Sequence, residues 1–140
     1  MHRVFVDSDI ILDVLAQREA FYIPAAKLFS LFDKGDVAGF TSPIVFANLH
    51  YILRKVKSKE YAVKSLIKLK SFISVLPVDS KIIDLALSSK FNDFEDAIQY
   101  HTAKSYEINF IITRNKKYYK QSKISVCTAD EYLKIWASEV

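Results

Sequence analysis

Short apolar runs alternate along this chain with longer segments in which apolar residues recur at helical spacing. The run at 3–6 combines β-branched and aromatic residues and stops abruptly at Asp7, which is typical of a buried strand. After Pro43, apolar residues through Val56 follow the 3.6-residue period, and proline in a first turn indicates a helix start. The full pattern predicts strands at 3–6, 37–40, 72–76, 110–112 and 124–127, and helices at 10–15, 21–34, 43–56, 60–71, 79–90, 92–106 and beyond Thr128.

Strands that alternate with helices indicate an α/β protein, and we expect a three-layer α/β/α sandwich with a mostly parallel central sheet. Only two glycines and three prolines occur, too few for the many tight turns of an all-β sandwich. A chain of 140 residues has the size of one ordinary domain, so we expect residues 1–140 to form a single domain with one core.

The composition argues against several classes of protein. Hydrophobic residues make up 51% of the chain and charged residues 26%, a mixture that supports a packed core rather than intrinsic disorder. No apolar run approaches the length of a membrane span, and the first residues lack the pattern of a signal peptide. The single cysteine, Cys127, can form neither an internal disulfide nor a cysteine-based zinc site. We therefore expect a cytoplasmic protein with no membrane association.

Positive charge is concentrated in two stretches of the sequence. The net charge is +4; residues 54–70 hold seven basic residues and one acidic residue, and residues 114–123 hold five basic residues and no acidic one. Such stretches form either solvated helix and loop surfaces or a footprint for a polyanion such as RNA or DNA. The charge pattern alone leaves both interpretations open.

Polar residues follow several predicted strands at the point where each strand ends. In an open parallel sheet, ligands bind beyond the carboxyl ends of the strands, so these residues are candidates for a functional site. Converging carboxylates repel each other and need a proton or a cation, and hard ions such as Mg²⁺ or Mn²⁺ take oxygen ligands. The candidates are Asp7, Ser8, Asp9, Thr41, Ser42, Thr113, Arg114 and Asn115, together with the acidic cluster Asp93, Glu95 and Asp96 at a helix start.

Several of these residues also have a purely structural interpretation. Asp7 could cap the helix that follows the first strand, and either Asn92 with Glu95 or Asp93 with Asp96 fits a helix capping box. Asn48 places a polar amide in the apolar register of its helix, which fits either a hydrogen-bonded core asparagine or a site residue. The sequence leaves these alternatives open.

Four short motifs together resemble those of PIN domains, the fold of VapC-type toxin ribonucleases. They are VDSDIILD at 6–13, TSPI at 41–44 with Asn48 on the following helix, DFEDA at 93–97 and TRNKKY at 113–118. The motifs follow the family's order and extend over nearly the whole chain, which makes the resemblance more specific than any single motif. It implies metal-dependent cleavage of RNA by acidic residues at the strand ends.

The resemblance also assigns the four acidic positions of the family. Its first and third acids fall on Asp7 and Asp96, whereas its second and fourth, usually glutamate and aspartate, fall on Asn48 and Asn115. Both replacements remove a negative charge, although an amide oxygen can still face a hard cation or bind a water. We therefore expect a weakened affinity for the divalent ion.

When bound, Mg²⁺ or Mn²⁺ would polarise a water and stabilise charge that develops on the phosphate. The resemblance implies that Asp7 and Asp96 bind the metal, with support from Asp9 and Asp93. It implies that Asn48 and Asn115 orient water or substrate, and that Ser42 and Thr113 hydrogen-bond the acids. Arg114 and Lys116 would contact phosphate.

From this resemblance we expect a metal-dependent endoribonuclease that cleaves single-stranded RNA, the toxin of a toxin–antitoxin pair whose antitoxin covers the acidic groove. Homodimers are common in the family. The alternative is a catalytically silent PIN-fold module that binds RNA or a protein partner, since two of the four acids are replaced. The sequence DSDI at 7–10 also resembles the haloacid dehalogenase phosphatase motif, but in that family the last acid pair ends a strand, whereas Asp93 and Asp96 precede one.

Overall fold

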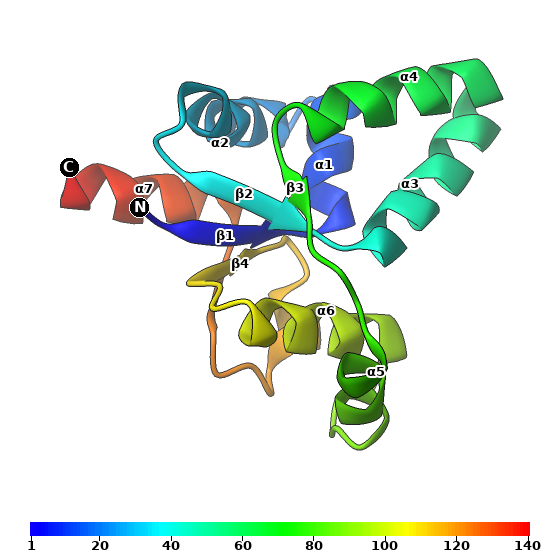
Figure 1. Cartoon of the computed structure of the whole chain (residues 1–140). Helices are drawn as coiled ribbons and strands as arrows, with labels where there is room; N and C mark the ends of the chain where they lie inside the picture. The colour runs from blue at the N-terminus through cyan, green and yellow to red at the C-terminus, as the bar shows by residue number, and fades with distance from the viewer.

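The computed structural model describes all 140 residues and contains a five-stranded sheet surrounded by helices (Figure 1). The strands are β1 (Arg3–Val6), β2 (Ala38–Thr41), β3 (Ser74–Val75), β4 (Phe110–Ile112) and β5 (Ser125–Cys127). The helices are α1 (Ser8–Leu15), α2 (Tyr22–Lys34), α3 (Pro43–Val56), α4 (Lys59–Lys70), α5 (Ser80–Leu87), α6 (Phe94–Ser105), the 3₁₀ helix η1 (Lys116–Tyr119) and α7 (Ala129–Glu139). None of them is both long and apolar enough to cross a membrane.

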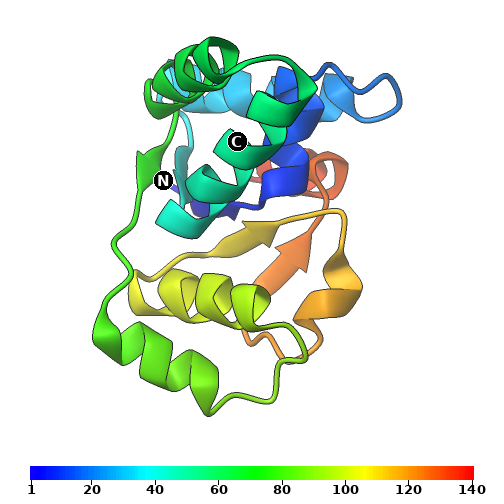
Figure 2. The same cartoon turned by 90° about the vertical axis from the view of Figure 1, so that its right-hand side faces the viewer.

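All neighbouring strands pair in parallel, in the order β3-β2-β1-β4-β5, which places β1 at the centre. Phe5 of β1 is in register with Phe40 of β2 on one side and with Ile111 of β4 on the other. Helices α1 to α4 and α7 cover one face of the sheet, and α5 and α6 cover the other (Figures 1 and 2). The three-layer α/β/α fold expected from the sequence is therefore confirmed.

The central strand explains why the opening apolar run is continuous rather than alternating. Val4, Phe5 and Val6 are all fully buried, because helices cover both faces of a parallel sheet. On β2 the backbone approaches its neighbours closely: a Cβ added to Gly39 would lie 2.8 Å from a side-chain carbon of Ile73 and 2.9 Å from the Phe32 ring. Glycine at this position therefore lets α2 pack tightly onto the sheet.

Several elements are shorter in the structure than the sequence pattern predicts. Helix α5 ends at Leu87 rather than residue 90, where the Ser88 and Ser89 hydroxyls donate to carbonyls of the last turn. Helix α6 begins at Phe94 rather than residue 92, because Asp93 is its N-cap. The third strand pairs only at Ser74–Val75, and the η1 turn was not predicted at all.

Candidate functional site

The carboxyl ends of three adjacent strands form one edge of the sheet. The backbone N–H of Asp7, just after β1, donates to the Ile112 carbonyl of β4 at 3.0 Å. On the other side, the Thr41 hydroxyl at the end of β2 donates to the Val6 carbonyl at 2.9 Å. The polar residues that follow β1, β2 and β4 therefore lie together, as the sequence predicts.

Asp7 occupies the centre of this edge, and both of its carboxylate oxygens are engaged. Oδ1 accepts the backbone N–H of Ser8 at 2.8 Å, so Asp7 also caps α1. Oδ2 accepts the hydroxyls of Thr113 at 3.1 Å and Tyr119 at 3.2 Å. Burial, and then the charge of Asp9, raise the pKa of Asp7 to about 6, although these hydrogen bonds partly oppose the shift.

Asp9 lies beside Asp7 and connects α1 to the chain that follows β4. Its Oδ2 accepts the backbone N–H of Arg114 at 2.8 Å and the Asn115 amide at 3.3 Å. The Thr113 hydroxyl, 3.1 Å from Asp7 and 3.4 Å from Asp9, lies between the two carboxylates. Burial is the largest of the effects that raise the pKa of Asp9. Thr113 thus contacts the acids as the sequence analysis expected.

Asp96 is contributed by the first turn of α6. Burial raises its pKa to about 7, and the charges of Asp93 and Asp7 act in the same direction. The Tyr119 hydroxyl, which donates to Asp7 at 3.2 Å, partly opposes this rise in the pKa of Asp96. The structure therefore places the two principal predicted acids near enough for their charges to interact, beside a buried tyrosine, Tyr119, that sequence reasoning missed.

Asp93 has the structural role that the sequence analysis left open. Its Oδ1 accepts a hydrogen bond from the backbone N–H of Asp96 at 2.9 Å, and its backbone carbonyl accepts one from the backbone N–H of Ala97 at 3.0 Å. Asp93 is exposed at the start of α6 and caps the turn that carries Asp96. Asp93 is therefore the N-cap of α6, but the Asp96 side chain does not return a hydrogen bond to the Asp93 backbone, so the capping box is only half formed.

Two further predicted site residues, Ser42 at the N-cap of α3 and Asn48 within α3, make no hydrogen bond to Asp7, Asp9 or Asp96. Ser42 is fully buried; it caps α3 through the Val45 backbone N–H at 3.2 Å and donates its hydroxyl to Gln99. We expected Ser42 to hydrogen-bond an acid, whereas its hydroxyl is used to join α3 to α6. The amide of half-buried Asn48 donates to Glu95 Oε2 at 3.0 Å, which also links α3 to α6.

The cations expected at the substrate are already paired within the protein. The Nε and Nη2 atoms of Arg114 each donate to a carboxylate oxygen of Asp13 at 2.9 Å, and Asp13 is only 1% exposed. The Arg114 guanidinium also lies 3.9 Å from the centre of the Phe21 ring. Lys116 pairs with Glu131 at 3.0 Å, while Asn115 is exposed beside it.

Nowhere in the chain are three or more histidine, cysteine, aspartate or glutamate side chains arranged as a ready-made metal site. The donor chemistry nevertheless suits a hard cation, because Asp7 and Asp96 offer carboxylate oxygens whose charge the surrounding protein incompletely compensates.

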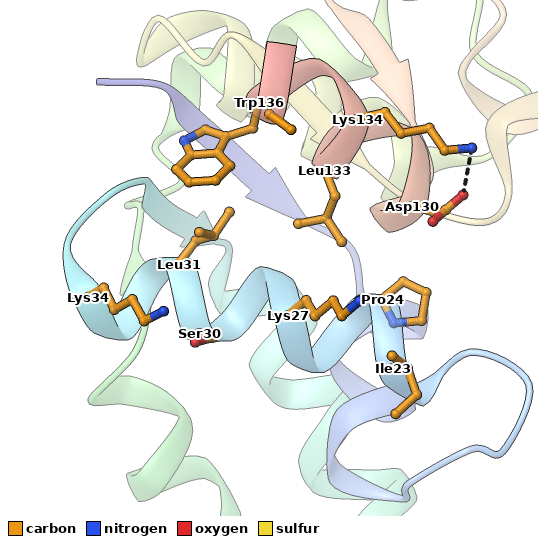
Figure 3. A pocket seen from close by; sticks show the side chains of 11 residues that line it. Ile23, Pro24, Lys27, Ser30, Leu31, Lys34, Asp130, Leu133, Lys134 and Trp136 are labelled. Atoms are coloured by element: carbon orange, nitrogen blue, oxygen red, sulfur yellow. Dashed lines mark ion pairs between the residues drawn. The ribbon is translucent and has the colours of Figure 1, made fainter. Parts of the chain in front are cut away.

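A groove of about 490 Å³ lies elsewhere, between α2 and α7 (Figure 3). Leu31 on α2 and Leu133 and Trp136 on α7 line it, and Lys134 at its rim pairs with Asp130 at 3.3 Å. None of the predicted site residues contributes to this groove. The acids therefore lie along the sheet edge rather than inside this hollow.

Solved structures with the same fold include toxins and toxin–antitoxin complexes. VapBC2 from Rickettsia felis, bound to a promoter DNA fragment, has a TM-score of 0.69 and 17% identity, covering 89% of this chain and 96% of that one. Mycobacterium tuberculosis VapC20, a toxin that cleaves the sarcin–ricin loop, has a TM-score of 0.61 and 18% identity, with coverages of 77% and 86%. A toxin–antitoxin complex from Klebsiella pneumoniae has a TM-score of 0.69 and 19% identity, with coverages of 90% and 97%.

At this level of identity the structural similarity establishes the fold alone. A search of curated proteins found no significant match. The family model described as PIN domain matches residues 3–117, a range that contains Asp7, Asp9 and Asp96 and the carboxyl ends of β1, β2 and β4. By this match and its fold, the chain belongs to the PIN domain family.

Proposed function

We propose that this protein is a metal-dependent endoribonuclease that cleaves single-stranded RNA. The observation that carries the proposal is the pair Asp7 and Asp96, two half-buried carboxylates with pKa values raised to about 6 and 7. Burial, and then the charge of neighbouring acids, disfavours the ionised form of both groups, so a proton or a cation stabilises them, and at neutral pH a divalent cation is the effective one.

In this proposal Asp7 and Asp96 hold Mg²⁺ or Mn²⁺, with Asp9 and Asp93 supporting the negative potential of the site. The ion supplies an activated water and a counter-charge for the phosphate. The protein contributes orientation: the Thr113 hydroxyl bridges Asp7 and Asp9, and capping by Asp93 stabilises the first turn of α6, which carries Asp96.

Asn115 and the basic stretches form the proposed contacts to RNA. The Asn115 amide reaches Asp9 at 3.3 Å from an exposed position, where it can orient a water or a phosphate oxygen. The lysines of 54–70 and 114–123 supply positive charge for the RNA backbone, so binding should weaken steeply with salt. Arg114 holds the loop in place and needs to leave Asp13 before it can bind phosphate directly.

We further propose that the protein acts as a toxin held inactive by an antitoxin, and that it forms homodimers. Similarity in fold to VapBC2 of Rickettsia felis and to the Klebsiella pneumoniae toxin–antitoxin complex supports this partner class. An antitoxin that inhibits the enzyme would cover the acidic edge of the sheet.

A catalytically silent module that binds RNA or a protein is the second candidate. The observation that favours it is the shortage of carboxylates, since amides stand at Asn48 and Asn115 and no three acids form a ready-made metal site. Binding of RNA would then depend on the basic stretches and not on Asp7.

The test compares wild type with Asp7→Asn and Asp96→Asn on single-stranded RNA in Mn²⁺, Mg²⁺ or EDTA. Asp84→Asn is the control, because Asp84 is an exposed acid on α5 whose side chain makes no hydrogen bond. We expect metal-dependent cleavage that both site variants lose by at least about 100-fold and the control retains. No cleavage, together with salt-sensitive RNA binding that Asp7→Asn leaves unchanged, would establish the silent module instead.

A further inference from the structure

Each of the two basic stretches supplies a lysine that lies over the ring of an exposed tyrosine. Lys55 Nζ lies 4.7 Å from the centre of the Tyr51 ring, and Lys117 Nζ lies 5.2 Å from the centre of the Tyr118 ring. The two tyrosines are 53% and 51% exposed, more than any other aromatic side chain of the protein. Because an ammonium group covers one face of a ring, the opposite face of each tyrosine remains available to a ligand.

The two tyrosines lie on the elements that leave the sheet on either side of β1. Tyr51 is on α3, which starts directly after β2, and Tyr118 is on η1, which follows β4. Strands β2 and β4 are the two neighbours of β1, which ends beside Asp7. The Tyr118 backbone N–H donates to the Asn115 carbonyl at 3.0 Å, and the Asn115 amide reaches Asp9 at 3.3 Å. The two rings therefore belong to the segments that flank the carboxyl end of the central strand.

An exposed aromatic ring beside a cation is a combination that suits a single-stranded nucleic acid. Unpaired bases stack on aromatic side chains whatever their sequence, because every base has a π-face, and removing one such side chain weakens binding by about fivefold or more. The lysine beside each ring supplies positive charge for the phosphate of the stacked nucleotide. In a duplex the bases are already stacked and paired, so the arrangement favours a strand with free bases.

We propose that Tyr51 and Tyr118 are stacking platforms for unpaired bases of a single-stranded RNA, and that Lys55 and Lys117 bind the adjoining phosphates. The inference rests on the proposed function insofar as the strand is the substrate that passes Asp7. It goes further than that function because it assigns contacts to the bases, which charge alone does not provide.

Binding of two labelled probes to the full chain, measured by fluorescence anisotropy, separates contacts to bases from contacts to the backbone. One probe is a single-stranded oligouridine, and the other is a strand of the same length that carries abasic riboses in place of the nucleosides. EDTA is present throughout, so that binding is measured without metal-dependent cleavage. We expect wild type to bind the oligouridine at least about tenfold more tightly than the abasic strand. Equal affinity for the two probes would overturn the proposal.

Variants of the two tyrosines assign the preference for bases to their rings. Tyr51→Ala and Tyr118→Ala should each raise the Kd for the oligouridine at least about fivefold and change the Kd for the abasic strand less than about twofold. Tyr51→Phe and Tyr118→Phe keep the rings and should bind the oligouridine within about twofold of wild type. Lys64→Ala is the control for charge, because Lys64 is exposed on α4 in the first basic stretch, and it should affect both probes by the same factor. Alanine variants that behave as this control does would refute the stacking role.

Ribonuclease activity in Mn²⁺ or Mg²⁺ is scored separately, so the two proposals fail in different ways. Wild type that prefers the oligouridine through both tyrosines but leaves RNA intact would uphold this inference and contradict the proposed function. Wild type that cleaves RNA but binds the oligouridine and the abasic strand equally would do the opposite. Wild type that binds neither probe would overturn the inference, and the exposed tyrosines would then indicate a surface for a protein partner.

Discussion

Replacing Arg114 with methionine should destabilise the fold by about 3 kcal/mol. Removing one partner of a buried ion pair typically costs about 3–5 kcal/mol, because the other charge stays buried and unpaired. In Arg114→Met the residue left without its partner is Asp13, whose side chain is 1% exposed and loses two hydrogen bonds of 2.9 Å. The lower end of the range applies, because the Arg114 side chain is 26% exposed and Arg18 remains 3.6 Å from Asp13.

Equilibrium unfolding in urea at pH 7 measures this loss directly. Lys116→Met is the control: its pair with Glu131 has both side chains nearly half exposed, so it should cost less than about 1 kcal/mol. In Asp13→Leu with Arg114→Met no charge remains buried, and we expect the double variant to be more stable than Arg114→Met alone. A loss for Arg114→Met no greater than that for Lys116→Met would refute the reasoning.

Three further predictions concern packing, protonation and thiol reactivity. Gly39→Ala should lower the free energy of unfolding by about 1–3 kcal/mol, because the added methyl group overpacks the contact with α2. Gly35→Ala should lower it by about 1 kcal/mol, because Gly35 has φ +76° but open space around it. Equal losses in urea unfolding would contradict this contrast. Asp7 and Asp96 have pKa values of about 6 and about 7 in the folded chain, above the ordinary value of about 4 that applies in the unfolded chain. The folded chain therefore binds more protons between these values, and the stability that the two groups contribute falls as the pH rises toward 7. The Tm of metal-free wild type should therefore fall between pH 4.5 and 8 relative to that of the Asp7→Asn, Asp96→Asn double variant, and a relative rise would exclude the raised pKa values. Burial raises the pKa of the Cys127 thiol to about 12, so iodoacetamide at pH 8 should label it only after unfolding, and rapid labelling of native protein would show that the thiol is accessible.

The sequence predicts the architecture well because the apolar pattern carries it. A continuous apolar run that stops at Asp7 indicates both a buried central strand and the residue after which that strand ends. Pro43 and Asp79 each mark the start of a helix. Element ends were less predictable, because α5 stops where Ser88 and Ser89 compete for its carbonyls rather than where apolar spacing fails.

The partners of site residues lie beyond what periodicity can indicate. Arg114 and Asp13 are 101 positions apart, and nothing in either local sequence shows that their side chains meet. Tyr119 was missed because it lies on a short 3₁₀ turn among lysines, where no apolar period marks it as buried. The strand ends thus predict which residues converge, and only the folded chain shows which of them are already paired.

The two outer strands also constrain how copies of this chain can assemble. β3 has two residues and β5 has three, so each rim of the sheet offers very few free backbone groups to another strand. Short rims of this kind protect a sheet against growth by strand addition and against edge-to-edge aggregation. Any association between two copies would therefore use surfaces other than these rims, such as α3 and α4, where Val56 and Ile67 are exposed to solvent.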